Sequence, residues 1–240
     1  MLQIRSFFVS FAPSKTVNLN TMKVVNFAEV RSVLNQYMAE IRDVQLQGDR
    51  LRFRRNIERI GELMAYEISK ELDYSVKKIQ TPLGVAQANT PDDDVVLATV
   101  FRAGLPFHAG FLDVFDKAGN AFVSAYRYYR DKECREVDVH IEYIASPDLN
   151  GKTLLLVDPM LATGESMDLA WKAFLTKGTP RRLILACVIA SQQGVDHLLK
   201  LFPSDDVILY CAAIDPLLND RKYIVPGLGD AGDLSYGGKL

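Results

Sequence analysis

From Val95 onward, short apolar runs alternate with amphipathic stretches, and this alternation limits the folds that the chain can adopt. Apolar runs of strand length lie at residues 95–101, 121–129, 152–157, 183–190 and 207–213, and a run of period two lies at 137–143. Helical segments follow at residues 105–115, 167–176 and 195–202. Strands that alternate with helices are joined by right-handed crossovers. We therefore predict an α/β fold with a mainly parallel twisted sheet flanked by helices.

The first part of the chain has a different pattern. Between residues 53 and 68, apolar side chains recur at steps of three and four, and two helices around the break at Gly48 fit residues 26–73 best. Residues 1–21 have no sustained period and end just before a second methionine, Met22. A length of 240 residues suits a single domain. We expect residues 1–21 to be an N-terminal extension and residues 22–240 to form one domain with an N-terminal helical region.

Composition argues against several classes of protein. Lys and Arg number 28 and Asp and Glu number 30, a net charge of −2 without a basic block, so binding to nucleic acid is not expected. No apolar run approaches the roughly 18 residues of a membrane span, and the opening stretch is too short for a signal peptide. Cys134, Cys187 and Cys211 lie far apart, which predicts reduced structural thiols. The expected location is the cytoplasm.

Residues 154–166 carry the clearest chemical signal. They run from a buried strand through Asp158 into a loop of small residues that opens a helix. Gly164 lets the backbone adopt conformations closed to other residues, so the loop amides can face an anion. The helix N-terminus adds partial positive charge. With the hydroxyls of Thr163 and Ser166, these features predict a site for a phosphomonoester. A structural alternative remains open, in which Asp158 only turns a strand into a helix whose N-cap is Ser166.

This segment resembles the phosphoribosyl pyrophosphate motif of type I phosphoribosyltransferases. Most of that superfamily holds the ribose hydroxyls with two adjacent acids, whereas the uracil branch has proline second, as in Asp158-Pro159. Residues 223–233 are similar to the uracil-binding segment of that branch, and residues 102–106 are similar to its pyrophosphate loop. Three motifs in the right order between residues 22 and 240 make the resemblance to the uracil phosphoribosyltransferase family specific.

The resemblance implies roles for individual residues. The expected catalytic residues are Asp158, which would accept hydrogen bonds from the ribose hydroxyls, and Arg102 and Arg130, which would contact the diphosphate. The residues expected to bind phosphoribosyl diphosphate are Arg102, Arg130, Asp158, Pro159, Met160, Leu161, Ala162, Thr163, Gly164, Glu165, Ser166 and Asp230. The residues expected to bind uracil are Ile224, Gly229, Asp230 and Ala231. Glu165 departs from the family because a second glycine is common there, and this predicts weaker phosphate binding.

The C-terminal segment supports the same interpretation from its own residues. Pro226 with Gly227, Gly229 and Gly232 cannot sustain a helix or strand, so we predict an irregular loop with free backbone groups. The resemblance implies that this loop forms a hood over the base. Main-chain donors and acceptors can match the carbonyls and N–H groups of uracil. Cytosine presents the opposite pattern at position 4, so a fixed backbone edge would reject it by orders of magnitude.

The reaction implied by the resemblance transfers the phosphoribosyl group of 5-phospho-α-D-ribose 1-diphosphate to N1 of uracil, giving UMP and diphosphate in pyrimidine salvage. Mg²⁺ is expected to be held mainly by substrate oxygens, with few protein ligands, and no residue is assigned as one of them. A homodimer or homotetramer is expected, and GTP is a candidate effector. The alternative from another class is a nucleotide-responsive RNA-binding regulator of pyrimidine genes on the same fold, which the net charge of −2 disfavours. A phosphoribosyltransferase for purine bases is a weaker rival, against which the C-terminal segment argues.

Overall fold

The computed structural model describes residues 22–129 and 137–238, and its main element is a twisted sheet with the strand order β1-β10-β9-β7-β4-β5-β6. The short β8 pairs with β9 off this path. Within this sheet, all described strand pairs are parallel except β5 with β6, so the predicted mainly parallel sheet is confirmed. The strands are β1 (Lys23–Asn26), β4 (Val95–Val100), β5 (Gly119–Tyr129), β6 (Val137–Ala145), β7 (Thr153–Val157), β8 (Met160–Leu161), β9 (Arg182–Ser191) and β10 (Val207–Asp215).

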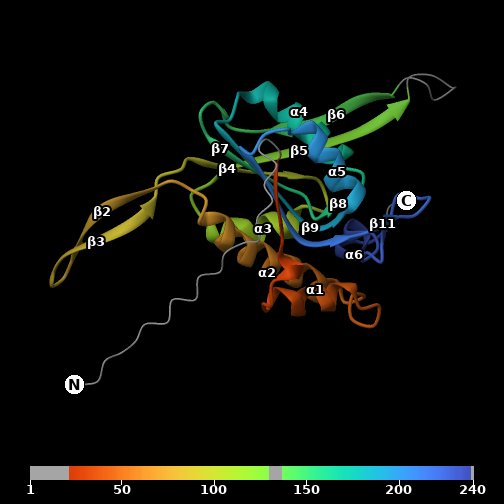
Figure 1. Cartoon of the computed structure of the whole chain (residues 1–240), viewed down its shortest axis with the longest axis horizontal. Coiled ribbons are helices and arrows are strands. Elements are labelled where there is room, and N and C mark those ends of the chain that lie inside the picture. Colours follow the sequence, from red (N-terminus) through yellow and green to blue (C-terminus); the bar gives the residue numbers. More distant parts are fainter. Residues whose placement is uncertain (1–21, 130–136, 239–240) are drawn as a thin grey trace.

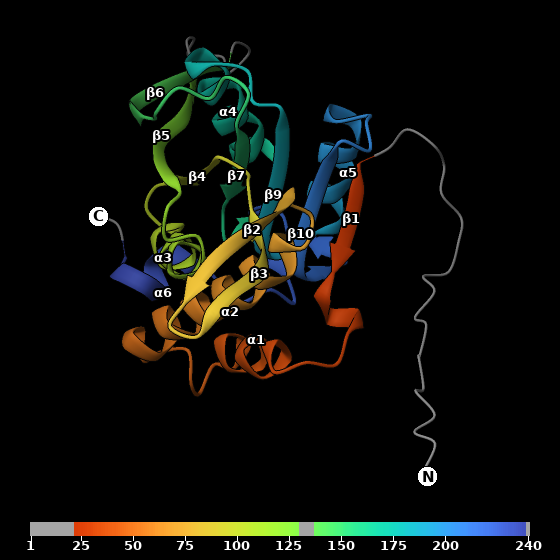
Figure 2. The same cartoon turned by 90° about the vertical axis from the view of Figure 1, so that its left-hand side faces the viewer.

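Helices cover both faces of this sheet, with α1, α2 and α3 on one side and α4 and α5 on the other (Figures 1 and 2). The two helices predicted around Gly48 are confirmed, and the Asp49 side chain caps the second by accepting from the backbone N–H groups of Leu51 and Arg52. The helices are α1 (Leu34–Arg42), α2 (Arg50–Ser69), α3 (Leu105–Val114), α4 (Glu165–Phe174), α5 (Gln192–Leu201) and α6 (Ala231–Tyr236), with short 3-10 turns η1 (Phe27–Glu29) and η2 (Leu175–Lys177). Within the described ranges, no helix has the length and apolar composition needed to cross a bilayer.

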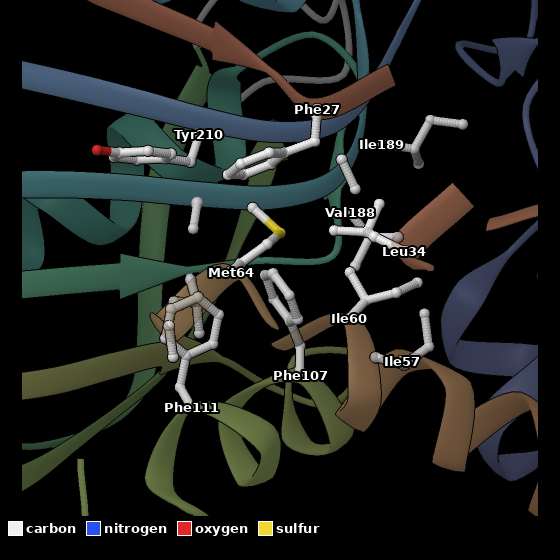
Figure 3. Packing of buried hydrophobic residues seen from close by; sticks show 14 of the residues in the cluster. Phe27, Leu34, Ile57, Ile60, Met64, Phe107, Phe111, Val188, Ile189 and Tyr210 are labelled. Atoms are coloured by element: carbon white, nitrogen blue, oxygen red, sulfur yellow. The ribbon is translucent and has the colours of Figure 1, made fainter. Parts of the chain in front are cut away.

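The central strands are buried on both faces, which explains why they read as continuous apolar runs. In β7, Leu155 and Val157 belong to the core layer under α1, α2 and α3, whereas Leu154 and Leu156 belong to the layer under α4 and α5. Figure 3 shows the first layer, where aromatic rings of α3 meet aliphatic side chains of α2 and β9. Cys187 and Cys211 are buried free thiols on neighbouring strands, as predicted, and Cys134 lies outside the described residues.

The structure contains elements that the sequence did not predict. Strand β1 lies at the sheet edge beside β10, directly before the region assigned to two helices, and no strand was predicted there. A hairpin of β2 (Tyr74–Thr81) and β3 (Gly84–Pro91) projects from the body at the left of Figure 1. None of the hairpin residues is buried. Because neither face of the hairpin packs on the core, its sequence lacks the apolar alternation that marks a strand.

Candidate active site

The three motif segments meet at the carboxyl edge of the parallel strands, where open α/β sheets bind ligands. Asp158 follows β7 directly, and Arg102 follows β4, the neighbouring strand. The C-terminal segment reaches the same edge, since the Ala231 N–H lies 3.4 Å from the Met160 sulfur. Arg102 Nη2 also donates to Asp233 Oδ1 at 3.0 Å. Arg130, the second expected diphosphate contact, lies outside the described residues.

Asp158 is the buried carboxylate at the centre of this edge, with 8% of the residue exposed. Its backbone N–H donates to the Ala186 carbonyl at 3.0 Å, and its Oδ1 accepts from the Met160 N–H at 3.3 Å. Burial raises the pKa of the Asp158 carboxyl to about 7, although the Met160 N–H opposes that shift. The Met160 N–H leaves most acceptor positions of this carboxyl open, so the ionised carboxylate can receive hydrogen bonds from a ligand.

The loop after Asp158 forms a small hollow at the N-terminus of α4. The hollow has a volume of about 50 Å³ and is lined by Met160, Leu161, Ala162, Thr163, Gly164, Ser166 and Met167. Gly164 is the N-cap residue of α4, with a φ of 83°, so the alternative in which Ser166 caps this helix is wrong. The chain enters the helix through a left-handed backbone conformation at Gly164, which glycine adopts without steric cost. Helix α4 therefore starts at Glu165, whose N–H donates to Thr163 Oγ1 at 3.4 Å, and the N-terminus of the helix faces the loop.

Residues on β9 and α5 support this loop from behind. Ser191 Oγ donates to the Ala162 carbonyl at 2.5 Å and accepts from the Gly194 N–H at 2.9 Å. A Cβ on Gly194 would lie 2.6 Å from the Ala162 carbonyl oxygen, so only glycine lets α5 approach so closely. The sequence did not single out either residue, although a serine between an apolar strand and a helix is an N-cap signal that pointed to Ser191.

Arg102, the first residue of the segment similar to the pyrophosphate loop, is hydrogen-bonded to the C-terminal segment. The peptide bond that precedes Arg102 is cis, and Nη2 donates to the Gly237 carbonyl at 2.6 Å as well as to Asp233. Its Nε is buried without a hydrogen-bond partner among the described residues. The Thr99 hydroxyl donates to the Val157 carbonyl at 2.9 Å and so ties the end of β4 to the end of β7. Arg102 thus carries an unused donor at the edge that holds Asp158.

The C-terminal segment is only in part the irregular loop that the glycines predicted. Strand β12 (Ile224–Val225) pairs with β11 (Leu217–Leu218), residues 226–230 are irregular, and α6 begins at Ala231 and includes Gly232. The helix forms because Asp230 caps it, its Oδ1 accepting from the Asp233 N–H at 2.9 Å. The prediction that this stretch contains no helix or strand was therefore wrong at both ends.

The predicted uracil-binding residues occupy two environments. Ile224 and Ala231 are buried in the core layer under α1 and α2, so their side chains serve packing. Gly229 is exposed with a φ of 93°, and Asp230 is partly exposed. A planar ligand at this place would therefore meet mainly backbone groups of the loop.

Comparison with known proteins identifies the family. Residues 29–238 match the family model described as uracil phosphoribosyltransferase. The chain belongs to the uracil phosphoribosyltransferase family. A relative of that name from Porphyromonas gingivalis is 58% identical over 219 residues, which cover 91% of this chain and all of the relative. Another of that name from Metallosphaera sedula is 35% identical over 206 residues, covering 83% of this chain and 94% of its own.

A solved structure of a protein from Aquifex aeolicus has the same fold as this uracil phosphoribosyltransferase family member. It superposes with a TM-score of 0.77 at 27% identity and covers 90% of this chain and 99% of its own. The resemblance inferred from the sequence motifs, and with it the assignment to the phosphoribosyltransferases, is therefore confirmed. No support is found for the alternative of an RNA-binding regulator.

Proposed function

We propose that this protein transfers the phosphoribosyl group of 5-phospho-α-D-ribose 1-diphosphate to N1 of uracil, giving UMP and diphosphate in pyrimidine salvage. The observation that carries the proposal is the meeting of three segments at one sheet edge around the buried Asp158. The Asp-Pro pair and the C-terminal loop point to uracil among the bases. A soluble salvage enzyme of this kind is expected in the cytoplasm.

The chemistry follows from the charges that the site must hold. The transition state has oxocarbenium character at the anomeric carbon while diphosphate departs, so groups that are already in place for both charges lower the barrier. The amides of the loop from Leu161 to Ser166 bind the 5-phosphate, and Asp158 accepts from the ribose hydroxyls through charge-assisted hydrogen bonds. Arg102, whose Nε has no hydrogen-bond partner among the described residues, donates to the diphosphate through its guanidinium. Arg130 supplies a second positive charge there.

Magnesium enters this scheme with the substrate. Mg²⁺ is usually held by one or two carboxylates together with substrate phosphates and water. No group of three or more His, Cys, Asp or Glu side chains placed to hold a metal is found within residues 22–129 and 137–238. Asp158, buried and with few protein partners, is the carboxylate that fits such a shared role. When bound, the ion supplies positive charge against the departing diphosphate.

A second copy of the chain is the proposed partner of the β2–β3 hairpin. An isolated two-stranded hairpin is marginally stable in water. Here Val76, Ile79 and Val85 are between 43% and 63% exposed on that hairpin. We therefore propose a homodimer or homotetramer, which light scattering of the purified protein distinguishes from a monomer. GTP as an effector is proposed on the resemblance alone, and adding it to the assay below tests it.

The decisive experiment is a comparison of bases. The protein is mixed with Mg²⁺, phosphoribosyl pyrophosphate and uracil, cytosine or hypoxanthine, and release of diphosphate and formation of the nucleotide are followed. We expect turnover with uracil and at least a hundredfold less with cytosine. Turnover with hypoxanthine and none with uracil would replace the proposal with a purine enzyme.

Glu165 gives a prediction about the phosphate loop. Its carboxylate stands at the first residue of α4, and at ~5 Å with an effective dielectric near 20 it would repel a phosphate charge by about 3 kcal/mol. The side chain should therefore point away from the phosphate while its N–H still donates. We expect Glu165→Gly to lower the KM for phosphoribosyl pyrophosphate several-fold at low salt and less at high salt. Glu165→Gln is the matched control, since it removes charge without freeing the backbone. A higher KM, or no dependence on salt, would mean that the carboxylate takes part in binding.

The N-terminal extension gives a second prediction. Met22 is 3% exposed and packs in the core layer under α4 and α5, and β1 follows it directly. We propose that a chain beginning at Met22 is sufficient for catalysis, and expect its kcat and melting temperature to match those of the full chain. A loss of either would mean that residues 1–21 contribute to the domain.

A further inference from the structure

The end of β10, another parallel strand of the ligand-binding edge, carries an ion pair that the mechanism above does not use. Asp215 is the last residue of β10 and is 6% exposed. Arg42, the last residue of α1, meets it in a two-pronged geometry, with Nη1 2.8 Å from Oδ2 and Nη2 2.8 Å from Oδ1. Such a planar fork orients both side chains as well as attracting them.

This pair also holds the backbone of the C-terminal loop. The Gly227 N–H donates to Asp215 Oδ2 at 2.8 Å, and the Gly227 carbonyl accepts from Arg42 Nη1 at 3.3 Å. Both polar backbone groups of one loop residue are therefore fixed by the same ion pair. Gln47 adds a third tie, since its Nε2 donates to the Leu228 carbonyl at 3.3 Å. The loop is thus anchored two residues before Gly229, at the place expected to face the base.

The backbone geometry at Gly227 leaves no room for a side chain, so this contact with the ion pair requires glycine. Its φ is 64°, and a Cβ added to it would lie 2.0 Å from the Ile224 carbonyl oxygen. Burial alone would raise the pKa of the Asp215 carboxyl, but hydrogen bonds from Arg42 and from the Gly227 N–H outweigh burial and hold that pKa below its usual value. Asp215 therefore stays ionised at neutral pH and keeps both the arginine and the loop in place.

We propose that Arg42 and Asp215 are positioning residues that set base specificity by anchoring Gly227 and thereby fixing the main-chain edge at Gly229. This inference rests on the proposed function. Discrimination between uracil and cytosine by a backbone edge requires that its donors and acceptors do not turn to suit the wrong base. Because the loop is rich in glycine, its own residues do not supply that rigidity. The ion pair supplies it from outside the site.

The test compares Arg42→Met, Arg42→Lys and Asp215→Asn with a matched control, Arg52→Met. Arg52 in α2 also joins its helix to α1 through a carboxylate, with Nε 3.0 Å from Glu40 Oε2, but among the described residues neither side chain is hydrogen-bonded to the loop. Steady-state rates are measured with uracil and with cytosine, each at saturating phosphoribosyl pyrophosphate. Melting temperatures are recorded for all variants.

For Arg42→Met we expect the KM for uracil to rise about tenfold and the preference for uracil over cytosine to fall about tenfold. The KM for phosphoribosyl pyrophosphate should change by less than about twofold, because the loop that holds the 5-phosphate is supported separately by Ser191. Arg42→Lys and Asp215→Asn should lie between the wild type and Arg42→Met. The control should retain wild-type selectivity.

The outcomes separate this inference from the proposed function. If the wild-type protein forms no UMP, the proposed function fails and the inference fails with it. If the wild type is active and the variants lose only thermal stability, with selectivity and the KM for uracil unchanged, the positioning role alone is refuted. Should Arg42→Met not fold, the two conservative variants decide the question by the same criteria.

Discussion

Replacing Asp158 by Asn is expected to lower kcat/KM for UMP formation by about 100- to 1,000-fold while leaving the fold intact. Asparagine keeps the shape of the side chain but removes the negative charge that the ribose hydroxyls and the oxocarbenium centre require. Because the carboxylate lies in a buried site, solvent does not compensate for its loss. Initial rates of UMP formation at varied phosphoribosyl pyrophosphate measure the effect.

The same variant should also change how the stability of the protein depends on pH, which a nonspecific loss of structure would not do. The pKa of Asp158 is about 7 in the folded protein and about 3.9 in an unfolded chain. Between those values the folded state holds a proton that the unfolded state has lost, so the stability of the unliganded protein falls as pH rises from about 4 to 7. The total fall in the free energy of unfolding is on the order of 4 kcal/mol, at 1.36 kcal/mol for each pKa unit. Asp158→Asn removes this decline and should melt at a higher temperature than the wild type at pH 8.

Substrate binding should have the opposite pH dependence. The ribose hydroxyls donate to the ionised carboxylate, so the affinity for phosphoribosyl pyrophosphate should rise with pH up to about 7 and then level off. Titration calorimetry at pH 6 and pH 8 measures this rise, which Asp158→Asn should abolish. Near-normal catalysis by the variant, or a wild-type affinity that falls with pH, would remove Asp158 from its assigned role.

Replacing Gly194 by Ala is expected to lower kcat/KM for phosphoribosyl pyrophosphate by about 100-fold, although Gly194 touches no substrate. The new methyl group would lie 2.6 Å from the Ala162 carbonyl oxygen and 2.7 Å from that of Leu161. Relief of those contacts shifts the phosphate loop by a large part of an ångström, and a misplacement of about 1 Å can cost a hundredfold in rate. Helix α5 itself gains from the better helix former, so thermal stability should change little by comparison.

Gly48→Ala is the control for this prediction. Gly48 lies in the turn between α1 and α2, and a Cβ built there meets nothing within 4 Å. Its kinetics should be those of the wild type. If Gly194→Ala also retains a normal KM for phosphoribosyl pyrophosphate, the loop is not held rigidly by α5 and the supporting role of Ser191 and Gly194 is refuted.

The parts of the fold that the sequence predicted are those buried in the sheet. Strands such as β7 and β9 are apolar along their whole length because both faces are covered, and their connections follow from the alternation with helices. The Asp158 segment was predictable for a related reason, because a carboxylate, small residues and a helix start follow one another in the chain. Features that depend only on residues close together in the chain can thus be predicted from the sequence.

The features that escaped prediction depend on contacts between distant residues. The β2–β3 hairpin buries no side chain and so leaves no period in the sequence. Arg42 and Asp215 are 173 residues apart, and nothing in either neighbourhood indicates the other. Helix α6 was missed because the glycines outweighed its cap, whose effect depends on the side chain of Asp230 meeting the Asp233 N–H. Tertiary context decided each of these cases.

The bonds of Arg102 to Asp233 and to the Gly237 carbonyl have a thermodynamic consequence. If the guanidinium exchanges these partners for the leaving diphosphate, then binding of diphosphate and docking of α6 both require the Arg102 side chain. Two equilibria that share a group are linked, and the coupling free energy is the same in both directions. A change that loosens the hold of α6 on Arg102 must then tighten binding of diphosphate by the factor by which diphosphate loosens α6. The C-terminal helix would in this way act as a competitor of the product, favouring its departure.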